Sequence, residues 1–174
     1  FVDTERLYDR IMFDGGETIT IRIKQSGSDK LIEKVFYIDS VIGTSKINET
    51  SELITLHFME DIAFISRFLN VNRSYSGSPQ DIIKKISEEY LNKEIYFAND
   101  DVYENKMKII VPNMEPLSAI SWIKNRMTTS EGMPYYLFSS FVGEKLNIAD
   151  LKSMINAPAI NSKSPFVHGV NNLY

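Results

Sequence analysis

The first third of the chain alternates polar and apolar residues with a period of two, the pattern of half-buried β-strands. It predicts three strands, at residues 18–24, 33–42 and 52–59. In the first of them Ile19, Ile21 and Ile23 share one face, and threonine and arginine side chains occupy the other. The polar loops at 25–30 and 43–51 are too short for the crossover that parallel strands need, so we expect antiparallel neighbours. Three strands leave open edges, which is typical of part of a barrel or sandwich.

Apolar residues three or four positions apart take over in the middle of the chain and predict helices. A short helix is expected to begin at residue 60 or 61. A second helix begins after Ser78, a preferred N-cap residue that is followed by Pro79 at the first helical position and by Asp81 in the first turn. Its inward-facing side chains are predicted to be Ile82, Ile83, Ile86 and Tyr90.

Beyond this helix, short strands and helices alternate. Strands are expected at 94–98 and 107–111, around an acidic stretch at 99–104 that we interpret as a solvated hairpin loop. Pro116 is expected to begin a helix whose buried stripe is Leu117, Ile120, Ile123 and Met127. A strand, a turn, a second strand and a short helix then follow at 135–141, 143–144, 145–148 and 149–155.

These elements predict an α+β protein with a partial antiparallel, tube-like β-barrel followed by a small α+β domain. The barrel part is expected to span residues 1–59 and the α+β domain residues 60–155. Residues 156–174 are expected to form an extended tail that leads toward a further domain. The chain begins at Phe1 rather than at methionine and has this loose tail, so we expect it to be a piece of a longer protein.

Composition narrows the chemistry more than the fold. The 174 residues include no cysteine and two histidines, so a thiolate zinc site, a cysteine nucleophile and a multi-histidine metal site are not expected. The formal net charge of −4 argues against a nucleic-acid footprint, which normally needs a basic face. No apolar run reaches the roughly 18 residues of a membrane span. We therefore predict no enzymatic activity, metal, cofactor, nucleic-acid binding or membrane insertion.

One acidic cluster could still carry chemistry. Asp100, Asp101 and Glu104 could form a cation site or an acid pair in an enzyme subunit. They lack the residue order of a calcium loop, and adjacent carboxylates point apart on an extended chain. We therefore favour a solvated loop over a site.

The histidines and the glycine pair also have plain interpretations. His57 falls within a predicted strand and is interpreted as a half-exposed sheet residue, because no nucleophile is arranged near it in sequence. His168 lies in the tail and is assigned no role. Gly15 and Gly16 are interpreted as a turn rather than a phosphate cradle, because no helix start or lysine follows them.

An aromatic group supplies the alternative function. Trp122, Tyr135 and Tyr136 could stack on a sugar, as in a glycan- or peptidoglycan-binding module. Packing of a helix on a hairpin explains the same residues and is favoured. The two hypotheses differ in exposure, because a glycan platform needs these rings on one exposed face, where Tyr135→Ala should abolish glycan pull-down.

The order and character of the elements resemble those of a known family. The residues that carry the resemblance are 16–21 (GETITI), 35–41 (VFYIDSV), 78–83 (SPQDII), 107–123 (MKIIVPNMEPLSAISWI), 132–138 (GMPYYLF), 143–147 (GEKLN) and 150–155 (DLKSMI). They span most of residues 13–155. In this order they resemble the baseplate central hub protein of contractile-tailed bacteriophages, the ring-forming partner of the tail spike.

The resemblance implies a structural role in the virion. In such hubs each subunit contributes two similar barrels, so that three subunits form a pseudo-sixfold ring between a sixfold tail tube and a threefold tail spike. It implies a homotrimer of the full-length protein, contacts with the tail tube and tail spike proteins, and no catalytic site. The early strands of the family's first barrel and its whole second barrel are absent from this sequence.

Overall fold

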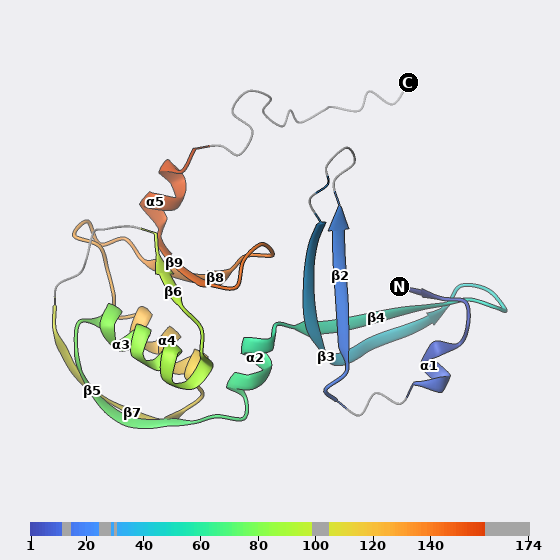
Figure 1. Cartoon of the computed structure of the whole chain (residues 1–174), viewed down its shortest axis with the longest axis horizontal. Coiled ribbons are helices and arrows are strands. Elements are labelled where there is room, and N and C mark those ends of the chain that lie inside the picture. Colours follow the sequence, from blue (N-terminus) through green and yellow to red (C-terminus); the bar gives the residue numbers. More distant parts are fainter. Residues whose placement is uncertain (12–14, 25–28, 30, 99–104, 159–174) are drawn as a thin grey trace.

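A computed structural model describes residues 1–11, 15–24, 29, 31–98 and 105–158. The elements in chain order are β1 (Val2–Asp3), α1 (Leu7–Arg10), β2 (Thr18–Lys24), β3 (Leu31–Lys46), β4 (Glu52–Met59), α2 (Asp61–Ser66), β5 (Val71–Gly77), α3 (Pro79–Ile86), the π-helical turn η1 (Ser87–Leu91), β6 (Ile95–Phe97), β7 (Met107–Met114), α4 (Pro116–Lys124), β8 (Tyr135–Ser139), β9 (Leu146–Asp150) and α5 (Leu151–Asn156). The predicted α+β class is confirmed: a curled, four-stranded half-barrel precedes smaller sheets and short helices (Figure 1).

The half-barrel is an antiparallel sheet with the strand order β1-β4-β3-β2. The predicted bounds of β2 and β4 are confirmed, whereas β3 runs over 16 residues and is longer than predicted. Two irregularities, between Ile38 and Ser40 and between Val41 and Gly43, interrupt its register with β4. Bulges bend a strand and increase its twist. They explain why β3 runs beside β2, turns a corner and continues beside β4 (Figure 1).

One face of the half-barrel is largely apolar. Strand register places on this face Ile19, Ile21, Ile23, Ile32, Phe36, Ile38, Val41, Ile54, Leu56 and Phe58. Burial along it is uneven, because Ile54 is completely buried whereas Ile23 is 49% exposed. A single polar side chain, that of Lys34, interrupts the row on β3, opposite Ile21.

The α+β part packs α3 and α4 between a two-stranded ribbon, β5-β7, and a three-stranded sheet, β6-β9-β8 (Figure 1). Its core contains Ile62, Val71, Tyr75, Ile82, Ile83, Ile86, Leu91, Ile95, Val111, Ala119, Ile120, Ile123, Met127, Tyr135, Leu146 and Ile148. The helices begin as predicted. Ser78 caps α3 by accepting a hydrogen bond from the Asp81 backbone N–H at 3.1 Å, and Pro116 opens α4.

Three predictions for this part are wrong. β5 was not foreseen, because only Val71 and Tyr75 of its seven residues are buried and the strand shows no alternation. The strands around the acidic stretch do not form a hairpin, since β6 pairs in parallel with β9 and β7 pairs with β5. The last helix begins at Leu151 rather than residue 149, because Asp150 ends β9 and its carboxylate accepts a hydrogen bond from the Ser153 N–H at 3.0 Å.

Candidate functional site

The aromatic residues singled out in the sequence do not form a common platform. Tyr135 is 2% exposed and belongs to the core, whereas Tyr136 is 44% exposed. Successive side chains of a strand point to opposite faces, so these two neighbours cannot both face one ligand. Trp122 is partly buried, and the guanidinium of Arg126 lies 3.9 Å from its ring centroid. Core packing is confirmed for Tyr135 and is wrong for Tyr136.

His57 is an exposed sheet residue, as predicted, and takes part in a small charged cluster. Its Nδ1 lies 2.9 Å from one carboxylate oxygen of Asp39, and the Arg67 guanidinium lies 2.6 Å from the other. The hydrogen bond from Arg67, followed by that from His57, holds the pKa of Asp39 below its ordinary value. The cluster ties β3 and β4 to the chain that follows α2.

The remaining sequence candidates divide into two groups. Gly15 and Gly16 have φ angles of 90° and 105° and are followed by a strand, which confirms the predicted turn. The acidic stretch with Asp100, Asp101 and Glu104, and also His168, lie outside the described residues. Among the residues that are described, no group of three or more histidine and carboxylate side chains could hold a metal ion. No helix in the same ranges is long and apolar enough to cross a bilayer.

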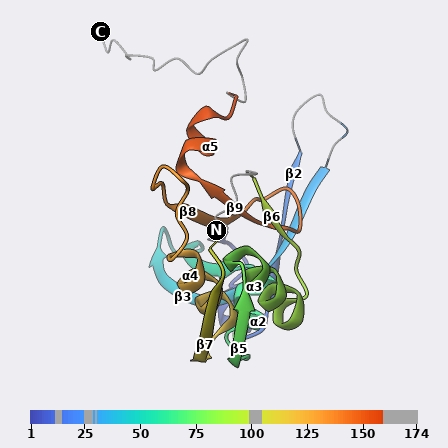
Figure 2. The same cartoon turned by 90° about the vertical axis from the view of Figure 1, so that its left-hand side faces the viewer.

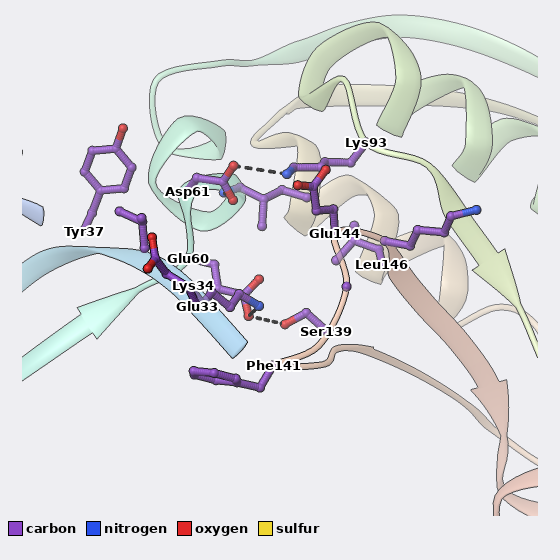
Figure 3. Close-up of a pocket in the computed structure, with 14 residues that line it drawn as sticks. Glu33, Lys34, Tyr37, Glu60, Asp61, Lys93, Ser139, Phe141, Glu144 and Leu146 are labelled. Atoms are coloured by element: carbon purple, nitrogen blue, oxygen red, sulfur yellow. Dashed lines mark hydrogen bonds and ion pairs between the residues drawn. The ribbon is translucent and has the colours of Figure 1, made fainter. Parts of the chain in front are cut away.

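The most developed hollow lies where the half-barrel meets the α+β part. It has a volume of about 660 Å³ and is lined by β3, the start of α2, the residue after η1 and the segment from β8 to β9. Its charged lining side chains are Glu33, Lys34, Glu60, Asp61, Lys93, Glu144 and Lys145 (Figure 3). Positive and negative groups are therefore mixed, which gives the junction cavity no strong preference for a ligand of one sign.

Lys34 is the central side chain of this junction. Its Nζ lies 2.8 Å from a carboxylate oxygen of Glu60 and donates a hydrogen bond to the backbone oxygen of Ser140, also at 2.8 Å. The Ser139 hydroxyl donates to the same carboxylate (Figure 3). Only 15% of the Lys34 side chain is exposed, so its charge is balanced within the junction rather than by bulk water.

Sequence reasoning missed this role, although the signal was present. Within the strand that begins the second run of alternation, Ile32, Phe36 and Ile38 mark the inward positions, and Lys34 occupies one of them. A lysine in an inward row is expensive to bury without a partner. Such a position therefore predicts a contact from another segment, which the turn after β8 supplies.

Edges form the other distinctive feature of the half-barrel. The Ile38 N–H donates to the Glu17 oxygen, which makes these two residues a hydrogen-bonded pair. Hydrogen-bonded and non-hydrogen-bonded pairs alternate along an antiparallel ladder, so Thr18, Thr20 and Arg22 direct their backbone N–H and C=O groups away from β3. In the part of the chain that the structure describes, no strand pairs with this side of β2.

The far ends of β2 and β3 extend beyond the rest of the half-barrel in both views (Figures 1 and 2). Ile23 and Leu31, both about half exposed, lie on this hairpin arm. On the other side of the sheet, β1 covers only the beginning of β4. Both sides of the half-barrel thus retain backbone groups available for pairing.

Comparison with known proteins adds no family. No protein-family model matches the chain, and no curated protein matches it either. The function is therefore argued from geometry and from the character of the elements.

Proposed function

We propose that this chain is a structural subunit of a bacteriophage baseplate hub, which acts as an adapter between a sixfold tail tube and a threefold tail spike. The observation that carries the proposal is the free edge of β2 beside an apolar sheet face. Exposed backbone groups on a sheet edge are a template for pairing with another chain. A ring built from half-barrels needs such edges at each joint.

The distribution of exposed apolar side chains supports the same proposal. Ile23, Leu31, Val35, Ile42 and Leu53 are all at least two-fifths exposed, and all belong to β2, β3 or β4. Scattered exposed apolar residues are ordinary on a protein surface, whereas a concentration on an incomplete sheet is typical of an interface. The order of strands and helices after the half-barrel also suits the hub resemblance.

The proposal assigns this role to shape and edge pairing, with no reacting group. Closed rings form when one surface of a subunit fits a different surface of the next. The β2 edge and the uncovered part of the β4 edge are two such surfaces on one half-barrel. Self-association in the full-length protein, and contacts with tube and spike proteins in the virion, follow from the proposal.

The direct test is the location of the chain in assembled particles. Tails purified from the phage or contractile injection system that encodes the sequence should contain the protein at the joint between tube and spike, in three copies per tail. Mass spectrometry and electron cryo-microscopy measure its presence, position and copy number. Absence from the particles, or a position remote from this joint, would contradict the proposal.

A matched pair of variants tests the β2 edge itself. Thr20→Pro removes an outward N–H without removing a hydrogen bond to β3, whereas Thr20→Val keeps that N–H and changes only the side chain. Incorporation into tails should be lost for the proline variant and kept for the valine variant. Normal incorporation of a folded Thr20→Pro protein would show that β2 is not the joint.

A further inference from the structure

The half-barrel and the α+β part have separate interiors. The core that runs from Ile62 to Ile148 includes no residue of β1 to β4. The buried apolar residues of the half-barrel are Phe36, Ile38, Ile54 and Met59. Two regions with separate cores are expected to move relative to each other unless a large apolar interface joins them. The contacts between them therefore decide the angle at which they meet.

One set of contacts lies on the outward face of β3 and involves α2. The rings of Tyr37 and Phe64 stack with centroids 4.2 Å apart and an interplanar angle of 2°. Arg67, just beyond α2, contacts Asp39 on the same face. α2 is anchored in the α+β part, because Ile62 belongs to its core. Since α2 also follows β4 directly along the chain, this side is the covalent attachment.

The second set of contacts lies on the opposite face of β3. Here the β8–β9 turn, residues 140–145, reaches the apolar face of the half-barrel. The Ser140 oxygen accepts a hydrogen bond from Lys34, and the Phe141 ring lies 6.0 Å from that of Phe36, centroid to centroid. Side chains 34 and 36 point away from side chains 37 and 39, so β3 is held between α2 and the turn.

The junction cavity shows that these contacts are not part of continuous packing. Protein interiors contain few voids larger than a water molecule. A hollow of about 660 Å³ nevertheless lies between β3, α2 and the β8–β9 turn (Figure 3). The turn thus reaches the half-barrel through the Lys34 and Phe36 contacts rather than through a filled interface, and their loss would leave the α+β core untouched.

We propose that the β8–β9 turn is a latch that fixes the angle between the half-barrel and the α+β part, with Lys34 and Phe141 as its two fastening side chains. In the latched state Lys34 joins the turn to Glu60, the residue at which α2 begins. When the latch opens, the half-barrel swings about the β4–α2 connection while both cores stay intact. This device is independent of the assembly proposed above.

Distances between two spin labels test the latch, and the absence of native cysteine makes the labelling specific. One label is placed at Ser45 on β3 and the other at Lys108 on β7, both exposed positions. Double electron–electron resonance should give one narrow distance distribution for the otherwise unchanged full chain. Lys34→Met and Phe141→Ala should each add a population at a shifted distance.

Two controls make every outcome informative. Val142→Ala changes an exposed side chain of the same turn and should leave the distribution unchanged. A second label pair at Lys108 and Lys152 lies within the α+β part and reports on its folding. If neither latch variant shifts the first distance, the latch is disproved. It is also disproved if the second pair broadens as well, because the turn then supports the fold itself.

Discussion

The α+β part and the half-barrel use the same kinds of side chain to different ends. In the α+β part Ile82, Ile83, Ile86, Ile120 and Ile123 are completely buried by their own region. Isoleucines are equally prominent in the half-barrel, yet Ile21 is only partly buried and Ile23 is half exposed. The first region derives its stability from within, whereas the second retains apolar surface for contact. Composition alone hides this difference, because both regions are rich in isoleucine.

Truncation of one isoleucine in each region should give the largest contrast. Ile120→Ala, in the filled core, should lower the free energy of unfolding by about 2–5 kcal/mol, because it leaves a cavity that neighbours cannot fill. Ile23→Ala should change it by about 0.5 kcal/mol or less, since half of that side chain is already in water. Urea unfolding followed by circular dichroism measures both. Equal losses would mean that the two regions are equally well packed.

A buried hydroxyl in the α+β part should give the next largest effect. The Ser66 hydroxyl, 1% exposed, accepts a hydrogen bond at 3.0 Å from the Leu117 N–H in the first turn of α4, where no side chain of α4 caps the helix. Ser66→Ala leaves that donor unpaired and should cost about 1–3 kcal/mol. Ser118→Ala, at an exposed position of α4, is the control and should be near neutral. Similar urea midpoints for the two variants would contradict this assignment.

The α+β part should also show a distinct response to alkaline pH. Burial raises the pKa of Tyr75 from its ordinary value of 10.0 to about 12. Its contribution to stability is complete below pH 10 and is lost as the pH rises toward 12, because the unfolded chain ionises first. Urea midpoints measured across this interval should fall less steeply for Tyr75→Phe. An identical slope would show that Tyr75 is not the responsible group.

The half-barrel should respond on the acid side, and more weakly. Arg67 and His57 hold the pKa of Asp39 below its ordinary value of 3.8. Stability from this carboxylate is therefore present above 3.8 and decreases as the pH falls through the lower folded-state pKa. The effect should be the smallest of the four, because solvent screens these exposed groups. Asp39→Asn should flatten the acid limb of the urea midpoint curve, and an unchanged limb would contradict the role of the pair.

Much of the half-barrel could be predicted because period-two alternation is a local signal. The bounds of β2 and β4 follow from it directly. The length of β3 does not, because each bulge shifts the alternation after Ile38. β5 escapes prediction since its serines and arginine face outward in a thin ribbon, and the parallel pairing of β6 with β9 depends on a partner some fifty residues away in sequence.

The site follows the same division between local and distant information. The inward position of Lys34 is evident from alternation, and it implies a buried lysine in need of a partner. That the partner is the oxygen of Ser140 depends on how the β8–β9 turn docks, which no local pattern encodes. Tyr135 and Tyr136 provide the converse case, because neighbours in a strand must face opposite ways and their separate fates could have been predicted.

The long strand β3 also has a mechanical consequence. It pairs with β2 along its first part and with β4 along its second, so the two ladders meet near the corner between Tyr37 and Ser40. A pull along the strand direction loads the hydrogen bonds of a ladder in shear, and many must break together. A pull at right angles peels β2 away one bond at a time. The half-barrel is therefore stiff in one direction and easily opened in the other.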